Sequence, residues 1–170
     1  MGIIATMPAA PIIRVSPVTA ALRDAVLRVR VRPEQDRFVS PPAHTLPDAE
    51  QCPGSEPMAI LLDAAVVGYY RIERSARSLA GRDEDADALG LRSFQLDAAC
   101  QGRGLGVTAM EALLADLTQR HPQARRIVLM VNCANAAALA LYRRAGFADS
   151  GTLYHGGRSG PQYLLWRALP

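Results

Sequence analysis

The chain has 170 residues, of which 49% are hydrophobic and 21% are charged, and its formal net charge is +3. This hydrophobic share suits one compact domain that spans residues 1–170 around a single core. The small basic excess, carried mostly by arginine, does not indicate a protein that binds nucleic acid. No apolar run approaches the roughly 20 residues that a membrane helix needs. We therefore expect no nucleic-acid or membrane partner.

The cysteines argue against a disulfide framework and against a zinc site. Cys52, Cys100 and Cys133 form no C-x-x-C pair and leave an odd count. Residues 1–11 lack the positively charged start of a signal peptide. These features favour a reducing, cytoplasmic location, and we expect no bound metal.

The start of the chain predicts a strand, a helix and then an irregular segment. A β-branched run at residues 12–15 is followed by apolar residues at helical spacing in residues 18–31. Five prolines exclude long regular structure from residues 32–54, although residues 46–51 could form a short helix. Such irregular segments often border binding sites.

The middle of the chain predicts a hairpin, a loop and a third strand. Residues 58–62 and 66–72 are apolar runs joined by a short connection, as in a β-hairpin. Residues 74–88 are polar and rich in acidic groups, which predicts a solvated loop. Residues 89–96 then predict another strand.

The remaining residues predict alternating helices and strands. A helix with a 3.6-residue apolar period follows the glycines of residues 102–106 and ends at His121 and Pro122. Residues 127–131 predict a buried strand, and residues 135–145 a helix capped by Asn135. Two more strands are expected at residues 147–153 and 162–169. This order predicts an α/β (α+β) fold, a mixed sheet with helices on its faces.

The segment from Cys100 to Gly106 joins a strand to a helix through three glycines. Glycines let the backbone approach a bulky anion, and a helix start presents unpaired N–H groups. Such a turn predicts a pyrophosphate site, although glycines could simply make a tight connection. Residues 104–109 also satisfy the G-x-G-x-x-A dinucleotide fingerprint, but the next strand ends at Asn132 rather than at an acid. That departure disfavours a nicotinamide or flavin enzyme.

Two segments carry a family resemblance. Residues 101–106, Q-G-R-G-L-G, resemble the Gln/Arg-x-x-Gly-x-Gly/Ala signature of GNAT superfamily N-acetyltransferases. Residues 131–147 resemble the V-N-x-x-N-x-x-A-x-x-L-Y-x-x-x-G-F segment of the same family. The resemblance covers residues 89–153 and implies the GNAT fold, a mixed central sheet of about seven strands with helices on both faces. A thinner similarity at residues 34–39 points to bacterial diamine and spermidine acetyltransferases.

The resemblance also implies acetyl-CoA as co-substrate and assigns residues to it. The backbone of the glycine turn would hold the pyrophosphate, and the preceding strand would pair with the pantetheine and offer an N–H to the thioester oxygen. The residues implied are Phe94, Gln95, Leu96, Gln101, Gly102, Arg103, Gly104, Leu105, Gly106, Asn135 and Tyr142.

The resemblance makes Tyr142 the proton donor to the departing thiolate. It lies seven residues after Asn135, about two helical turns, and therefore on the same helix face. Without the surrounding motif, Tyr142 would be read as a core tyrosine and Asn135 as a helix cap.

The general base is harder to predict. Many GNAT enzymes place a glutamate on the fourth strand, but residues 89–96 contain no carboxylate. Glu73 and Glu34 are candidate bases, acting directly or through water, although the residue type itself favours a surface charge at each position.

The acceptor is expected to be the primary amine of a small molecule, and the loop charges point in two directions. Acidic residues in residues 32–50 favour a polyamine-like acceptor, whereas His155 and Arg158 favour one that carries a carboxylate. Polyamines rank first, amino acids second and protein N-termini last. A non-catalytic acyl-CoA-binding regulatory domain is the alternative, and a homodimer stays open.

Overall fold

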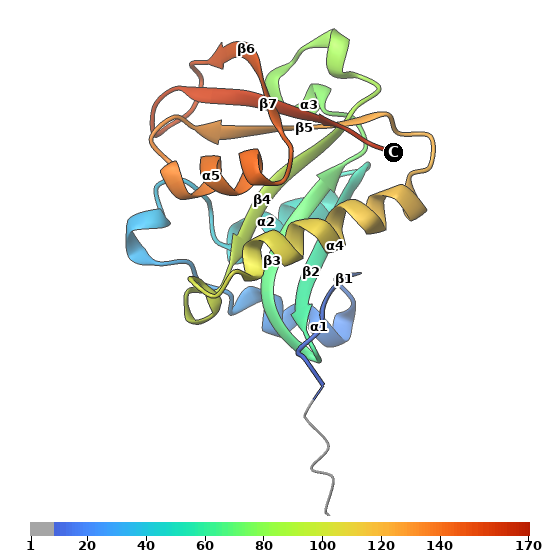
Figure 1. Cartoon of the computed structure of the whole chain (residues 1–170), viewed down its shortest axis with the longest axis vertical. Helices are drawn as coiled ribbons and strands as arrows, with labels where there is room; N and C mark the ends of the chain where they lie inside the picture. Colours follow the sequence, from blue (N-terminus) through green and yellow to red (C-terminus); the bar gives the residue numbers. More distant parts are fainter. Residues whose placement is uncertain (1–8) are drawn as a thin grey trace, which may run out of the picture.

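The computed structural model describes residues 9–170 and contains a seven-stranded sheet in the order β1-β2-β3-β4-β5-β7-β6 (Figure 1). Neighbouring strands are antiparallel except β4 and β5, which are parallel. The predicted mixed sheet is therefore confirmed. The strands are β1 (Ile13–Pro17), β2 (Ser55–Leu62), β3 (Ala65–Glu73), β4 (Leu89–Leu96), β5 (Arg126–Asn132), β6 (Ala148–Tyr154) and β7 (Gln162–Ala168).

Helices cover both faces of this sheet. In Figure 1, α4 crosses the near face and α2 lies behind the sheet. Within residues 9–170, no helix is both long enough and apolar enough to span a bilayer. The helices are α1 (Ala20–Leu27), α2 (Pro42–Gln51), α3 (Arg77–Ala80), α4 (Leu105–Arg120) and α5 (Ala136–Arg144), with single 3₁₀ turns at Pro33–Gln35, Asp83–Asp85 and Ala98–Cys100.

Strand alternation divides the core between the two faces. Tyr70 packs with the apolar stripe of α4, whereas the adjacent Tyr69 packs with Val26 of α1 and Leu46 of α2. All four side chains are fully buried or nearly so. The sheet is therefore covered by packed side chains on both faces.

Two expected segments differ from the sequence prediction. The helix expected at residues 46–51 begins earlier, because Pro42 stands at its first position, where no backbone N–H is needed. The polar segment of residues 74–88 is not a solvated loop throughout, so that prediction is wrong. Ala76 and Ala88 are buried against the sheet, and the carboxylate of buried Asp85 lies within 3.4 Å of Arg126.

Strands β4 and β5 separate where the site lies. They pair at three positions, the last joining Leu91 to Leu129, whereas β4 continues to Leu96. A bulge in β4 lies at this point, because two of its residues stand opposite the single residue Tyr70 of β3. Ser93, in the bulge, has a backbone φ of 58°, a value that residues other than glycine rarely adopt. The bulge redirects β4 away from β5.

Candidate functional site

A cavity of about 610 Å³ lies between the separated ends of β4 and β5. Its wall combines β4, the glycine turn after it and the N-terminal parts of α4 and α5. Arg103 belongs to the same turn but is exposed and contributes nothing to the wall. The other residues assigned to acetyl-CoA all line it: Phe94, Gln95, Leu96, Gln101, Gly102, Gly104, Leu105, Gly106, Asn135 and Tyr142.

The edge of β4 that faces this cavity offers backbone hydrogen-bonding groups. The residues of β4 from Arg92 to Leu96 lie beyond the last residue of this strand that pairs with β5. An extended chain could therefore add to this edge as a further strand. The site can in this way bind a ligand with amide groups along its length.

The glycine turn leaves room beside its backbone. Gly102 and Gly104 both have a φ of 75°, and a Cβ atom built at Gly104 would meet no atom of the described residues within 4 Å. Gly104 is also the N-cap of α4, a helix of 16 residues. The first N–H groups of such a helix have no partner within it and attract anions. The geometry fits a pyrophosphate.

Gln101 fixes the turn from within. Its Nε2 donates to the carbonyl oxygen of Leu96, at 2.9 Å, and to Oε1 of Gln35, at 2.8 Å. Nε2 of Gln35 in turn donates to Oε1 of Gln101, at 3.0 Å. The turn is thus bonded both to the end of β4 and to the irregular segment that precedes α2.

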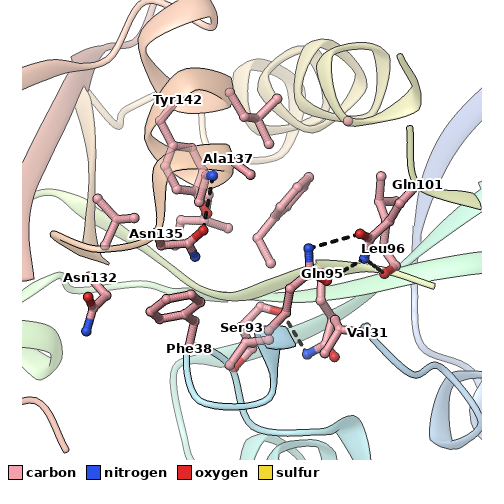
Figure 2. Close-up of a pocket in the computed structure, with 18 of the residues that line it drawn as sticks. Val31, Phe38, Ser93, Gln95, Leu96, Gln101, Asn132, Asn135, Ala137 and Tyr142 are labelled. Carbon is pink, nitrogen blue, oxygen red and sulfur yellow. Dashed lines mark hydrogen bonds between the residues drawn. The ribbon is translucent and has the colours of Figure 1, made fainter. Parts of the chain in front are cut away.

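Helix α5 presents Asn135 and Tyr142 to the same cavity (Figure 2). Oδ1 of Asn135 accepts a bond from the Ala138 N–H at 3.2 Å, so the predicted helix cap is confirmed. The ring of Tyr142 lies edge-on to Phe94 and to Phe147, with centroid distances of 6.4 and 5.8 Å. Burial raises the pKa of Tyr142 above its ordinary value. Its hydroxyl therefore stays protonated at neutral pH.

The two candidate bases lie elsewhere. Glu34 is exposed in a 3₁₀ turn, and Glu73 is buried, with Oε1 at 2.7 Å from Nε of Arg71 and Oε2 accepting from Ser55 Oγ at 2.5 Å. Neither glutamate lines the cavity. Asp97, which follows β4, accepts bonds from the backbone of Ala99 and Arg30 instead.

A second cavity, of about 310 Å³, adjoins the first. Both walls include Phe38, Arg92, Asn132 and Gln162, so the two spaces meet at these residues. Arg158 lines the second cavity, whereas His155 does not. Arg92, which lines both cavities, is not predicted from the sequence, because the family resemblance implies only a carboxylate in residues 89–96.

Comparison with known proteins agrees with this geometry. The family model described as "Acetyltransferase (GNAT) family" matches residues 24–147. An uncharacterized N-acetyltransferase of Bacillus subtilis, YbbJ, is 34% identical over 118 residues, which are 69% of this chain and 74% of the relative. The spermine/spermidine N(1)-acetyltransferase of the same organism is 28% identical over 141 residues, 83% of this chain and 91% of the relative.

A solved structure with the same fold is the aminoglycoside acetyltransferase AAC(6')-Ib, determined with paromomycin and acetyl-CoA. It superposes with a TM-score of 0.73 at 20% identity and covers 92% of this chain and 93% of its own. The likeness confirms the predicted fold. From the family match and the sequence relatives together, the chain belongs to the acetyltransferase (GNAT) family.

Proposed function

We infer that this protein transfers the acetyl group of acetyl-CoA to the primary amine of a small molecule. The observation that carries this inference is one cavity that joins the open edge of β4, the glycine turn before α4, and Tyr142. These three features supply what the donor needs: a strand to pair with, a site for phosphates and a nearby proton.

The residues present fit acetyl-CoA. The turn from Gly102 to Gly106 would hold the pyrophosphate through backbone N–H groups and the N-terminus of α4. The β4 edge up to Leu96 would pair with the amide-bearing arm, and Asn135 would border it from α5. These assignments match those that the family resemblance implies.

The chemistry requires alignment and one proton. Acetyl-CoA supplies an acyl carbon activated as a thioester, which the amine nitrogen attacks as the C–S bond breaks. A backbone N–H of β4 near Leu96 would bond to the carbonyl oxygen, where negative charge develops. The hydroxyl of Tyr142 would give its proton to the departing sulfur. The nitrogen would lose its extra proton to water, and water would return a proton to Tyr142.

The geometry favours an acceptor that enters as the neutral amine. Glu34 and Glu73 lie off both cavities, and Glu73 is paired with Arg71. A role for either as base would have to operate through water. Positioning of the amine against the thioester then supplies much of the rate enhancement.

The test is an acetyl-transfer assay on a broad panel of small amines, read by thiol release and product mass. We expect release of free thiol coupled to formation of an N-acetylated product. Tight acetyl-CoA binding without transfer to any amine would contradict the enzyme assignment and favour an acyl-CoA-binding regulatory domain.

A further inference from the structure

The second cavity has an unbalanced positive wall. Arg37, Arg92 and Arg158 line it, together with a single acidic residue, Asp36. Its wall continues into that of the first cavity, so an acceptor bound in the second cavity would lie next to the donor site. An acceptor bound there must be compatible with guanidinium groups.

Hydrogen bonds hold this wall together. Oγ of Ser159 donates to the carbonyl oxygen of Arg37 at 2.5 Å, and the carbonyl oxygen of Ser159 accepts from Nδ2 of Asn132 at 2.9 Å. These bonds join the β6–β7 loop to the segment before α2 and to the end of β5. Arg158 is thereby positioned next to a fixed residue.

The guanidinium groups of Arg92 and Arg37 have N–H groups available to a ligand. The nearest carboxylate to Arg92, that of Glu73, lies at 3.8 Å, beyond hydrogen-bonding distance, and the same oxygen is 2.7 Å from Arg71. The side chain of Arg92 is 45% exposed. The guanidinium of Arg37 stacks on the ring of Phe38 at 4.4 Å, which leaves its N–H edge open.

The acidic residues that would favour a polyamine are mostly engaged or remote. Asp48 is bonded to Arg71 at 2.6 Å, and Glu50 to Arg23 at 2.9 Å. Glu34 lies off both cavities, which leaves Asp36 on the wall. A polyamine carries several positive charges and would face three arginines with one carboxylate to offset them.

We propose that the acceptor is a small amino acid, and that Arg92 and Arg158 bind its carboxylate. The inference rests on the proposed acetyl transfer. Arg92 lines both cavities and precedes Phe94 by two residues in β4, so a carboxylate bound there lies near the reacting end of the donor site. Arginine binds carboxylates through paired, charge-assisted bonds.

The experiment compares acceptors that differ only in the carboxylate. The standard amino acids and spermidine are first assayed with acetyl-CoA, and the best amino acid is then compared with its amide and its decarboxylated amine. We expect the amino acid to exceed both by roughly 10- to 100-fold in kcat/KM, the range for a lost charged hydrogen bond. Equal use of the amide, or a preference for spermidine, would overturn the proposal.

Substitutions of the two arginines test whether they bind the carboxylate. Arg92→Gln and Arg158→Gln should each raise the KM for the amino acid by roughly 10-fold or more, and should raise the KM for the amide much less, because the amide carries no carboxylate. Arg28→Gln, a change at an exposed arginine outside both cavities, is the matched control and should change nothing. An unaltered amino-acid KM in both cavity variants would contradict the assignment.

A binding measurement separates this proposal from the proposed function. The same amino acid is titrated calorimetrically into the protein saturated with CoA, which requires no turnover. Binding that Arg158→Gln weakens, without transfer in the assay, would support the ligand class and contradict only the acetyl transfer. Transfer to amines without such binding would contradict the ligand class alone.

Discussion

Gln35 and Gln101 exchange a pair of amide hydrogen bonds, of 3.0 and 2.8 Å, across 66 residues of sequence. Gln101 opens the proposed pyrophosphate turn, whereas Gln35 lies in the segment that leads to Phe38 and the second cavity. The pair therefore links the donor side of the site to the acceptor side. The backbone N–H of Arg32 adds a third bond to Oε1 of Gln35.

Removing this link should affect the acceptor more than the donor. In Gln35→Ala the side chain of Gln101 keeps its bond to Leu96, so the turn retains its shape. We expect kcat/KM for the amine to fall roughly 10-fold, as the loss of the hydrogen bonds of Gln35 suggests, with little change in acetyl-CoA affinity. Gln123→Ala, at an exposed position, serves as the control. Equal loss of donor affinity would show that the pair supports the turn instead.

Tyr142→Phe should lower kcat by about 10²- to 10⁴-fold, the usual contribution of a proton donor. The ring contacts with Phe94 and Phe147 survive this change, so the fold and acetyl-CoA affinity should be kept. Tyr70→Phe is the matched control, because the buried hydroxyl of Tyr70 makes no hydrogen bond within the described residues. Turnover within about threefold of the parent would make Tyr142 structural.

The pH profile gives a second readout of Tyr142. Because burial raises its pKa above the ordinary 10.0, the hydroxyl remains protonated and able to donate throughout about pH 6 to 9. The kcat of the wild-type protein should therefore rise with pH as the amine loses its proton, and show no fall below about pH 10. A descending limb near neutrality that disappears in Tyr142→Phe would contradict this assignment.

Substitutions at Ser93 test the bulge in β4 next to the site. At a φ of 58°, glycine fits and a β-branched residue is strained by about 1–3 kcal/mol. We expect Ser93→Gly to preserve the free energy of unfolding and Ser93→Val to lower it by about that amount, as measured by urea denaturation. If Ser93→Val is as stable as the parent, the bulge does not require this backbone conformation.

Asn135 combines a structural role with a proposed binding role, and two substitutions separate them. Asn135→Ala removes the cap on the Ala138 N–H and should lower the unfolding free energy by about 1 kcal/mol. Asn135→Ser retains a capping oxygen and should recover most of that stability. If the residue also contacts acetyl-CoA, both variants should bind it more weakly; unchanged affinity in Asn135→Ser would leave only the cap.

The features that the sequence predicts well are local ones. The glycine turn, the long helix after it and the cap at Asn135 each depend on residues within a few positions of one another, so spacing alone identifies them. The strands follow in the same way from short apolar runs. The mixed sheet then follows from their order.

The features that the sequence does not predict depend on distant contacts. Ser159 meets Arg37 across 122 residues, and no local pattern marks that meeting. Arg92 acquires significance only because β4 leaves β5 just before it. The sequence around Asp85 predicts a solvated charge, whereas in the structure the sheet brings Arg126 next to it. The residues that line the second cavity can therefore be identified only from the structure.

Acetyl-CoA binding by a Gly104→Glu variant tests the central claim most directly. A glutamate there would fill the space beside the turn and place a negative charge where the pyrophosphate should bind. Gly151→Glu is the matched control, because Gly151 also has a positive φ, 79°, and open space, but lies outside both cavities. Calorimetry should show binding lost in folded Gly104→Glu and retained in Gly151→Glu. Unchanged affinity in folded Gly104→Glu would contradict the account.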